Sequence, residues 1–378
     1  MKTTFATRRR LLWAALLSPA AFVLAGCPNP NANTPTTTAS PSGEGSPSAS
    51  ATASPGTGTA TGATRKIKAG LVTDVGGVND RSFNTLAWEG LQRAGKDLGA
   101  DIKYTESKQN ADYVNNLSQF ARAKYDVVFA VGFLMQDAVK EVAAKYPDTK
   151  FAIIDGDAPN SPNAVSYKFK EEEGSFLAGA IAAGMSKSGT VGFVGGMEMP
   201  LIKKFEAGYT AGAKTINPKA KVTVGYSGKF DDPQKGQEIA LSQMGAGADV
   251  IFHAAGATGT GVIKAVQNKG AGFYAIGVDK DQDGEAPGRV LTSMVKKVDV
   301  AVYDVCKAVA SDSFKPGTIV LGLKDGAVGL SEMKYTKKDV PAPVMAKVEA
   351  LQKQIIAGTV TPPSTPEQLA TFKAPTVK

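Results

Sequence analysis

Short apolar runs alternate with amphipathic stretches from residue 66 onward. Apolar runs that end at polar or turn residues predict buried strands, and in the first half they fall at 68–73, 101–104, 127–131, 151–154 and 164–167. Stretches with helical spacing of their apolar positions lie at 82–98, 112–123, 136–145 and 171–185. Strand-helix-strand units require parallel strands and right-handed crossovers, so the pattern predicts a parallel sheet covered by helices.

The same alternation begins again at residue 190. Strands are predicted at 190–194, 221–225, 250–252 and 273–276. Helices are predicted at 201–216, 233–244 and 259–268. Two rounds of one unit predict an α/β protein with two doubly wound parallel-sheet lobes that face each other across a cleft.

The first 26 residues have the pattern of a secretory signal peptide. Basic residues precede an apolar run over 11–24, and small residues follow it. The ending Leu24-Ala25-Gly26-Cys27 resembles the bacterial lipobox, which predicts a lipidated Cys27 as membrane anchor. An uncleaved anchor helix is the alternative, although the run is short for a span of about 20 residues. Arg8, Arg9 and Arg10 also resemble part of a twin-arginine export signal, so the export route stays open.

Residues 27–65 are rich in Pro, Ser, Thr, Gly and Ala. Such a segment buries too little apolar surface to offset its conformational entropy, so a disordered tether is predicted. A tether lets a folded domain reach a partner in the membrane, and a tolerated low-complexity insert is the alternative. At the other end, residues 336–378 are predicted to hold one helix over 344–356 and then a loosely ordered tail.

Charge and composition exclude several function classes. The net charge is +8, and half of it comes from Lys2 and Arg8 to Arg10 in the leader. The remaining chain has no basic block with interleaved aromatics, which argues against nucleic acid as a partner. His253 is the single histidine, so a histidine metal site and a Ser-His-Asp triad lack support, and no metal or cofactor is expected. His253 is expected to pack near the cleft wall, and Cys306 to be a small buried residue of a helix.

Polar residues stand where predicted strands end. Asp74 follows the strand at 68–73, Asp155 follows the run 151–154, and Asp279 follows the run 274–278. Open α/β sheets bind ligands at the carboxyl ends of their strands, so these carboxylates are expected to face the cleft and accept hydrogen bonds. Asp80 and Asn84 lie in the next loop and helix start. For Asp74, Asp80 and Asn84, helix or turn capping explains the residue type equally well.

Phe83 and Phe205 are the candidate aromatic contacts. Each lies in a polar setting near the start of a helix that follows a strand, one in each lobe. Closure of the lobes would then place two rings against opposite faces of a flat ligand, and stacking contributes about 1–3 kcal/mol per base. The alternative is a phenylalanine packed in the core.

Six motifs resemble those of the basic membrane protein family of bacterial solute-binding lipoproteins. They are NDRSFN (79–84), IIDGD (153–157), GSFLAG (174–179), KFEAGYTAG (204–212), IGVDKDQ (276–282) and LTSMVKKVD (291–299). The best understood members of this family are purine nucleoside receptors that serve ABC importers. The resemblance runs from about residue 66 to 330.

The resemblance implies a periplasmic binding protein-like fold of type 1 with a multi-strand hinge. Segments around Val295 and after Phe314 are then further crossings between the lobes. The implied boundaries give lobe 1 residues 66–187 and about 296–315. Lobe 2 takes residues 188–295 and about 316–335.

The resemblance also implies roles for individual residues. Asp155 would contact the base and Asp279 the sugar diol. Lys296 would donate to a ribose oxygen, with the adjacent Lys297 as an alternative, and Gly256 would let the backbone approach the sugar. Charge-assisted hydrogen bonds contribute about 1.5–3 kcal/mol each, so a few of them plus stacking reach micromolar affinity.

The predicted function is that of an extracytoplasmic solute-binding lipoprotein of an ABC importer, not an enzyme. Its expected partners are a purine nucleoside, a membrane permease and, through the N-terminal lipid, a bacterial membrane of the cell envelope. The binding protein itself is expected to be a monomer. The alternatives are a nucleoside-processing enzyme and a surface sensor or adhesin with the same fold.

Overall fold

The computed structural model describes residues 65–377. The predicted signal peptide, Cys27 and nearly all of the predicted tether lie outside the described residues. No helix within 65–377 combines the length and apolar character needed to cross a membrane.

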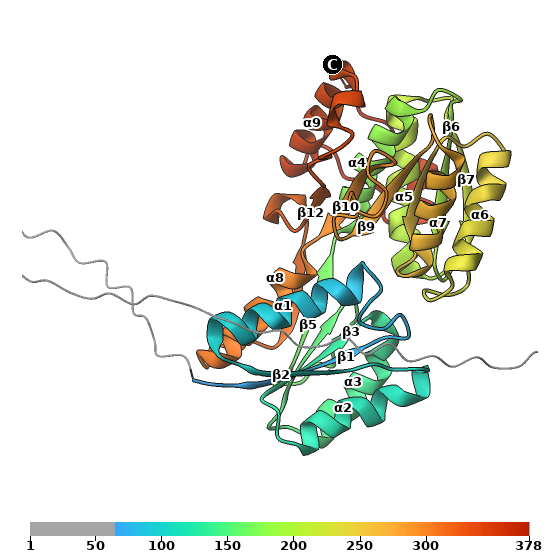
Figure 1. Ribbon diagram of the computed structural model, residues 1–378. Helices are drawn as coiled ribbons and strands as arrows, with labels where there is room; N and C mark the ends of the chain where they lie inside the picture. Colours follow the sequence, from blue (N-terminus) through green and yellow to red (C-terminus); the bar gives the residue numbers. More distant parts are fainter. Residues whose placement is uncertain (1–64, 378) are drawn as a thin grey trace, which may run out of the picture. The chain divides into compact units, whose positions relative to one another are not determined.

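The lobe 1 sheet is wholly parallel, with the strand order β11-β5-β4-β3-β1-β2. Its strands are β1 (Lys68–Thr73), β2 (Asp101–Thr105), β3 (Val127–Val131), β4 (Lys150–Ile154), β5 (Ala164–Phe169) and β11 (Gly317–Leu321). Its helices are α1 (Phe83–Leu98), α2 (Tyr113–Arg122), α3 (Gln136–Lys145) and α8 (Val298–Ala310). Figure 1 shows α1 and α8 on one face of this sheet and α2 and α3 on the other. Burial of all of β3 on both faces explains its continuous apolar run.

The lobe 2 sheet has the order β12-β10-β9-β8-β6-β7, in which β12 alone pairs antiparallel. Its strands are β6 (Thr190–Gly195), β7 (Lys221–Tyr226), β8 (Val250–Ala254), β9 (Tyr274–Asp279), β10 (Val290–Lys296) and β12 (Val328–Leu330). Its helices are α4 (Glu171–Met185), α5 (Pro200–Ile216), α6 (Pro233–Gly245) and α7 (Thr258–Lys269). The successive strands of each lobe occupy the same places in their sheets, so the two predicted rounds of one unit are confirmed.

The chain crosses between the lobes three times: at 169–171, at 296–298 and at 321–323. Two boundaries differ from those expected. Helix α4 was assigned to lobe 1, but it packs on α5 of lobe 2. A Cβ on Gly179 would fall 1.9 Å from the Tyr209 carbonyl oxygen, so the two helices touch through backbone. Strand β11 was assigned to lobe 2, but it pairs with β5 of lobe 1.

The C-terminal segment contains α9 (Ala342–Ile356) and α10 (Pro366–Thr371). The rings of Phe372 and Phe176 meet edge-on with centroids 5.8 Å apart, and Val360 is buried. The tail therefore packs on lobe 2, in contrast to the loosely ordered end expected from its Pro and Thr content. Short 3-10 turns complete the chain at η1 (Asn110–Asp112), η2 (Phe133–Met135), η3 (Leu323–Asp325) and η4 (Lys337–Asp339).

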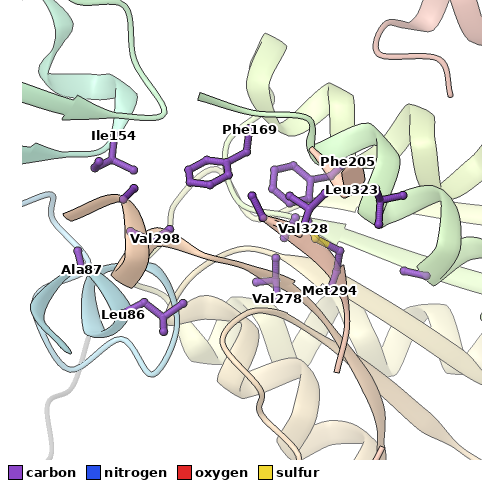
Figure 2. Packing of buried hydrophobic residues seen from close by; sticks show 14 of the residues in the cluster. Leu86, Ala87, Ile154, Phe169, Phe205, Val278, Met294, Val298, Leu323 and Val328 are labelled. Carbon is purple, nitrogen blue, oxygen red and sulfur yellow. The ribbon is translucent and has the colours of Figure 1, made fainter. Parts of the chain in front are cut away.

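One hydrophobic cluster continues from lobe 1 into lobe 2. Figure 2 shows Phe169, at the end of β5, near Phe205 of α5, with Leu323 and Val328 beyond it. Separate clusters fill the outer layers under α2 and α3 and under α6 and α7. Cys306 is fully buried in α8, as its helical pattern predicts.

Candidate functional site

A pocket lies where the carboxyl ends of the two sheets face each other. All nine residues selected from the sequence line it: Asp74, Asp80, Phe83, Asn84, Asp155, Phe205, Gly256, Asp279 and Lys296. The lining residues enclose a cavity of about 50 Å³. The opposing walls therefore stand close together, as in a narrow slot.

The loop before α1 is organised by Asp80. Its carboxylate accepts hydrogen bonds from the backbone N–H groups of Ser82, Asn84 and Thr85 at 2.9–3.0 Å. These are N–H groups at the start of the helix, which lack intrahelical partners. Burial raises the pKa of Asp80 to about 6, although these three backbone N–H groups oppose the rise. Asp80 thus caps α1, which is the alternative the sequence left open.

Asp74 and Asn84 form a buried pair beside the same loop. Asn84 Nδ2 donates to Asp74 Oδ1 at 2.8 Å, and the Gly76 N–H donates to the same oxygen at 2.9 Å. Burial raises the pKa of Asp74 despite these hydrogen bonds. Asn84 Oδ1 is buried and has no hydrogen-bond partner among the described residues, which makes it an acceptor for a group in the pocket.

Phe83 and Phe205 come from equivalent helices, because α1 follows the first strand of lobe 1 and α5 the first strand of lobe 2. The Lys296 ammonium nitrogen lies 4.8 Å from the Phe83 ring centroid and 5.6 Å from that of Phe205. Phe83 is half-buried, whereas Phe205 is 3% exposed and packs against Phe252 at 6.5 Å between centroids. Phe205 is therefore both a core residue and a pocket wall.

Asp155 and Asp279 also occupy equivalent places, at the ends of β4 and β9. Both have φ of 63°, a left-handed conformation that is uncommon outside glycine but is adopted by aspartate more readily than by most residues. The turn directs each carboxylate toward Lys296 at the end of β10. Lys296 Nζ is 2.5 Å from Asp155 Oδ2 and 3.4 Å from Asp279 Oδ1.

Lys296 is the cation at the centre of this site. Its side chain is 2% exposed. A third carboxylate oxygen, Glu171 Oε1, lies 3.8 Å from Lys296 Nζ. Burial lowers the pKa of Lys296, but Asp155, Asp279 and Glu171 together outweigh this and raise it, so the ammonium stays charged. Burial raises the pKa of Asp155 to about 7, with Lys296 opposing the rise. Lys297, the alternative from the sequence, is exposed and does not line the pocket.

Polar contacts tie the loop before α1 to the loop after β9, across the two lobes. Ser82 Oγ donates to Asp279 Oδ2 at 2.9 Å, and Gln282 Nε2 donates to the Arg81 carbonyl oxygen at 3.1 Å. Arg81 also forms an ion pair with Glu285 at 2.5 Å. These contacts therefore join the two lobes beside the pocket, which Asp279 itself lines.

His253 lies in β8 and does not line the pocket. It is fully buried, and its Nε2 is 3.0 Å from Gln282 Oε1. Burial lowers its pKa to about 4, with Gln282 opposing, so the imidazole is neutral at physiological pH. Within residues 65–377, no group of His, Cys, Asp and Glu side chains has an arrangement that could hold a metal ion.

Sequence reasoning missed an aromatic contact between the lobes. Phe133 of η2 and Phe230 of the loop after β7 both line the pocket, and their rings meet edge-on at 6.2 Å between centroids. Phe133 follows β3 and Gly132 directly, so the strand-end rule that found Asp74 would also have found it. Phe230 lies in an irregular loop, where no periodic pattern marks it. Phe230 also approaches Gly256, whose added Cβ would lie 3.3 Å from the Phe230 carbonyl oxygen.

Comparison with known proteins identifies the family. Residues 67–365 match the family described as "ABC transporter substrate-binding protein PnrA-like". This chain belongs to that family. The family consists of substrate-binding proteins of ABC transporters and not of enzymes, as the sequence predicts. The resemblance stated from the motifs is thereby confirmed.

Relatives and solved structures agree with this assignment. An "ABC transporter nucleoside-binding protein BmpA" of Lactococcus lactis is 37% identical over 318 residues, which cover 79% of this chain and 89% of the relative. An uncharacterized lipoprotein of Pyrococcus horikoshii is 41% identical over 287 residues, covering 72% and 71%. An ABC transporter solute-binding protein of Aeropyrum pernix K1 superposes with a TM-score of 0.73 at 30% identity, covering 81% and 96%. The two-lobed α/β fold of this family is confirmed.

Proposed function

We propose that this protein is a lipid-anchored, extracytoplasmic receptor for a purine nucleoside, which it delivers to an ABC permease. The observation that carries the proposal is the composition of the pocket. One half-buried and one buried aromatic ring, Phe83 and Phe205, enter it from different lobes, and a buried cation with two carboxylates lies beside them. The Lactococcus relative is named a nucleoside-binding protein, which supports the same ligand class.

A purine nucleoside matches the chemistry of each wall. Its base is flat and can stack on an aromatic ring, and the N–H groups of the base and the ribose hydroxyls are donors. Asp155 and Asp279 each have one buried oxygen without a hydrogen-bond partner among the described residues. In this proposal Asp155 accepts from the base and Asp279 from the sugar diol. Lys296 donates to a ribose oxygen, and the backbone at Gly256 approaches the sugar.

Transport requires the lobes to respond to the ligand. A ligand that contacts residues of both lobes binds the closed arrangement better than an open one, so it shifts the equilibrium toward closure. The permease would then distinguish the loaded receptor by the positions of its lobes. We expect the receptor to act as a monomer anchored through Cys27.

Calorimetric titration with inosine tests the site. Phe83→Ala and Asp279→Ala should each lower the affinity for inosine by at least about tenfold, since stacking or a charge-assisted hydrogen bond contributes about 1–3 kcal/mol. Phe314→Ala is the matched control, because Phe314 is half-buried between α8 and β11 and lines a different surface hollow. Unchanged binding in both site variants would refute the assignment of the site. Mass spectrometry of a copurifying small molecule would identify the natural ligand.

The anchor is tested separately from the ligand. Cells that are fed radiolabelled palmitate should incorporate the label into the full chain, and Cys27→Ala should incorporate none. A wild-type chain without label, or a Cys27→Ala variant with as much label as the wild type, would contradict lipidation of Cys27.

A further inference from the structure

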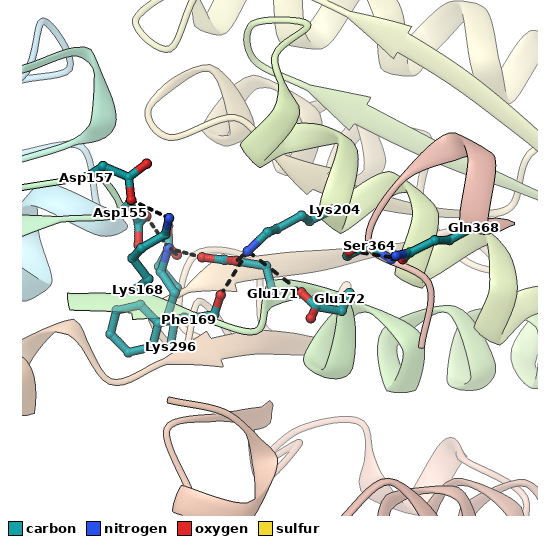
Figure 3. A network of polar contacts seen from close by, with 11 residues as sticks. Asp155, Asp157, Lys168, Phe169, Glu171, Glu172, Lys204, Lys296, Ser364 and Gln368 are labelled. Atoms are coloured by element: carbon teal, nitrogen blue, oxygen red, sulfur yellow. Dashed lines mark hydrogen bonds and ion pairs between the residues drawn. The ribbon is translucent and has the colours of Figure 1, made fainter. Parts of the chain in front are cut away.

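Behind the pocket, an ionic network runs along the first crossing between the lobes, and it is buried except for Lys204, whose side chain is 28% exposed, and Glu172 beside it. Glu171 is the first residue of α4, directly after that crossing, and its side chain is 1% exposed. Its Oε2 atom lies 3.1 Å from Lys204 Nζ of α5, and its Oε1 atom lies 3.8 Å from Lys296 Nζ. Figure 3 shows Glu171 between these two lysines. Neither Glu171 nor Lys204 lines the pocket.

Each lysine also holds a group of lobe 1. Lys296 Nζ donates to Asp155 Oδ2, which follows β4, at 2.5 Å. Lys204 Nζ donates to the carbonyl oxygen of Phe169, the last residue of β5, at 3.3 Å. Glu171 is therefore the shared partner of two cations that both reach across to lobe 1 at the crossing.

The charges of the network do not cancel if every group is ionised. Asp155, Asp279 and Glu171 surround Lys296, and Lys204 is the second cation, with Glu172 4.0 Å from it. An uncompensated buried charge is costly, so such a cluster takes up a proton on one of its carboxyl groups. Asp155 is the group of this cluster that faces the pocket from lobe 1 and whose second oxygen has no hydrogen-bond partner among the described residues.

We propose that Glu171 and Lys204 are positioning residues that set the charge of Asp155, and that Glu171 also holds the Lys296 ammonium in the pocket. Given the proposed function, two groups that never touch the ligand would control the affinity for it. Binding would weaken in acid, because a protonated Asp155 no longer accepts as a carboxylate from a ligand donor. The two positioning residues carry opposite charges, so their removal must move this acid limit in opposite directions.

The signs follow from the groups that face Asp155. Lys296 favours its ionised form, whereas Glu171, Asp279 and Asp74 disfavour it. Burial also raises the pKa of Glu171, but Lys296 and Lys204 oppose the rise and favour its ionised form. Glu171→Gln removes this negative charge, so the pKa of Asp155 falls. Lys204→Met removes a positive charge that interacts with Asp155 from farther away, so the pKa of Asp155 rises by a smaller amount.

A carboxyl titration without ligand tests the inference directly. The protein is labelled with [13Cγ]aspartate, and the Asp155 resonance is assigned by its loss in Asp155→Asn. Asp155 should titrate at lower pH in Glu171→Gln than in the wild type. In Lys204→Met it should titrate at higher pH. Lys203→Met is the matched control, because Lys203 is the neighbouring lysine of α5 and pairs with Glu198 and Glu206 instead. Shifts of the same sign in the two variants, or no shift in either, would overturn the proposal.

Inosine titrations across pH 5–8 give the second readout. Glu171→Gln should extend strong binding to lower pH, and Lys204→Met should restrict it to higher pH, while a purely structural defect would weaken binding equally at every pH. If Glu171→Gln fails to fold, Lys204→Met alone decides. Only a charge effect raises the pH below which this variant loses inosine binding. If the wild type binds no purine nucleoside, the proposed function fails, but the carboxyl titration still decides the roles of Glu171 and Lys204.

Discussion

Removal of the Lys296 charge should destabilise the protein in a pH-dependent way. In Lys296→Met, three carboxyl groups that surround a buried ammonium lose that cation while staying buried. Asp155 is 2.5 Å, Asp279 3.4 Å and Glu171 3.8 Å from the nitrogen in the wild type. Loss of one partner of a buried ion pair costs about 3–5 kcal/mol, because the remaining charge has no compensation.

Protonation of the carboxyl groups limits this loss of stability and determines how the loss changes with pH. Burial already raises the pKa values of Asp155 and Glu171, with Lys296 opposing the rise. Without the ammonium these two pKa values rise further in the folded state, while the unfolded state keeps ordinary values near 4. The folded variant then binds more protons than the unfolded variant above pH 4, so its stability falls as the pH rises. Each extra bound proton adds a slope of about 1.4 kcal/mol per pH unit. We expect a deficit of about 3–5 kcal/mol near pH 8 and less than about half of it near pH 5.

Urea unfolding followed by the fluorescence of Trp88 measures this deficit at both pH values. Lys297→Met is the matched control, because Lys297 is the adjacent residue and is exposed; its free energy of unfolding should stay within about 0.5 kcal/mol of the wild type. Equal stability of Lys296→Met and the wild type at pH 8 would refute the view that Lys296 compensates these carboxylates. A deficit of the same size at pH 5 and pH 8 would refute the protonation step.

Two further predictions concern groups outside the pocket. His253 is the single histidine and its pKa is lowered to about 4, so its imidazole proton resonance should not shift between pH 7.5 and pH 5.5. Because a lowered pKa means fewer protons bound in the folded state, His253 costs stability as the pH falls through 6.5 toward 4, and His253→Gln should reduce the acid loss by up to about 3 kcal/mol. Gly179→Ala should lower the free energy of unfolding by about 1–3 kcal/mol in urea titrations, because its Cβ would fall 1.9 Å from a carbonyl oxygen of α5. Gly245→Ala is its control: nothing lies within 4 Å of the added Cβ, so this variant should be neutral or more stable, and an equal loss in both would contradict the close helix contact.

Local patterns predicted the elements and the strand-end residues well. The apolar run 68–73 predicts β1 correctly, and Asp155 and Asp279 stand out in the sequence because each closes an apolar run. Helix α1 begins at Phe83, one residue from the predicted start. These features depend on neighbours in sequence, so a single chain shows them.

The sequence pattern does not predict features that depend on contacts between residues far apart in the chain. The lobe to which α4 belongs is decided by backbone contact between Gly179 and Tyr209, and no periodicity in α4 indicates this partner. Strand β11 pairs with β5, about 150 positions away in the chain, and it follows α8 of lobe 1 before the chain crosses to lobe 2 at 321–323. The network of Glu171 and Lys204 needed the same three-dimensional information, since both charges read as ordinary solvated helix residues.

The late position of α8 and β11 in the chain has a consequence for biosynthesis. Helix α8 lies so close to α1 that a Cβ on Gly90 would fall 2.3 Å from the Asp299 carbonyl oxygen, and β11 completes the edge of a sheet begun at Lys68. A nascent polypeptide that stops before residue 298 therefore lacks one of the two helices that cover one face of the lobe 1 sheet, and it also lacks the border strand of that sheet. Lobe 1 cannot reach its final packing until most of lobe 2 has been synthesised. We therefore expect the two lobes to complete their folding together.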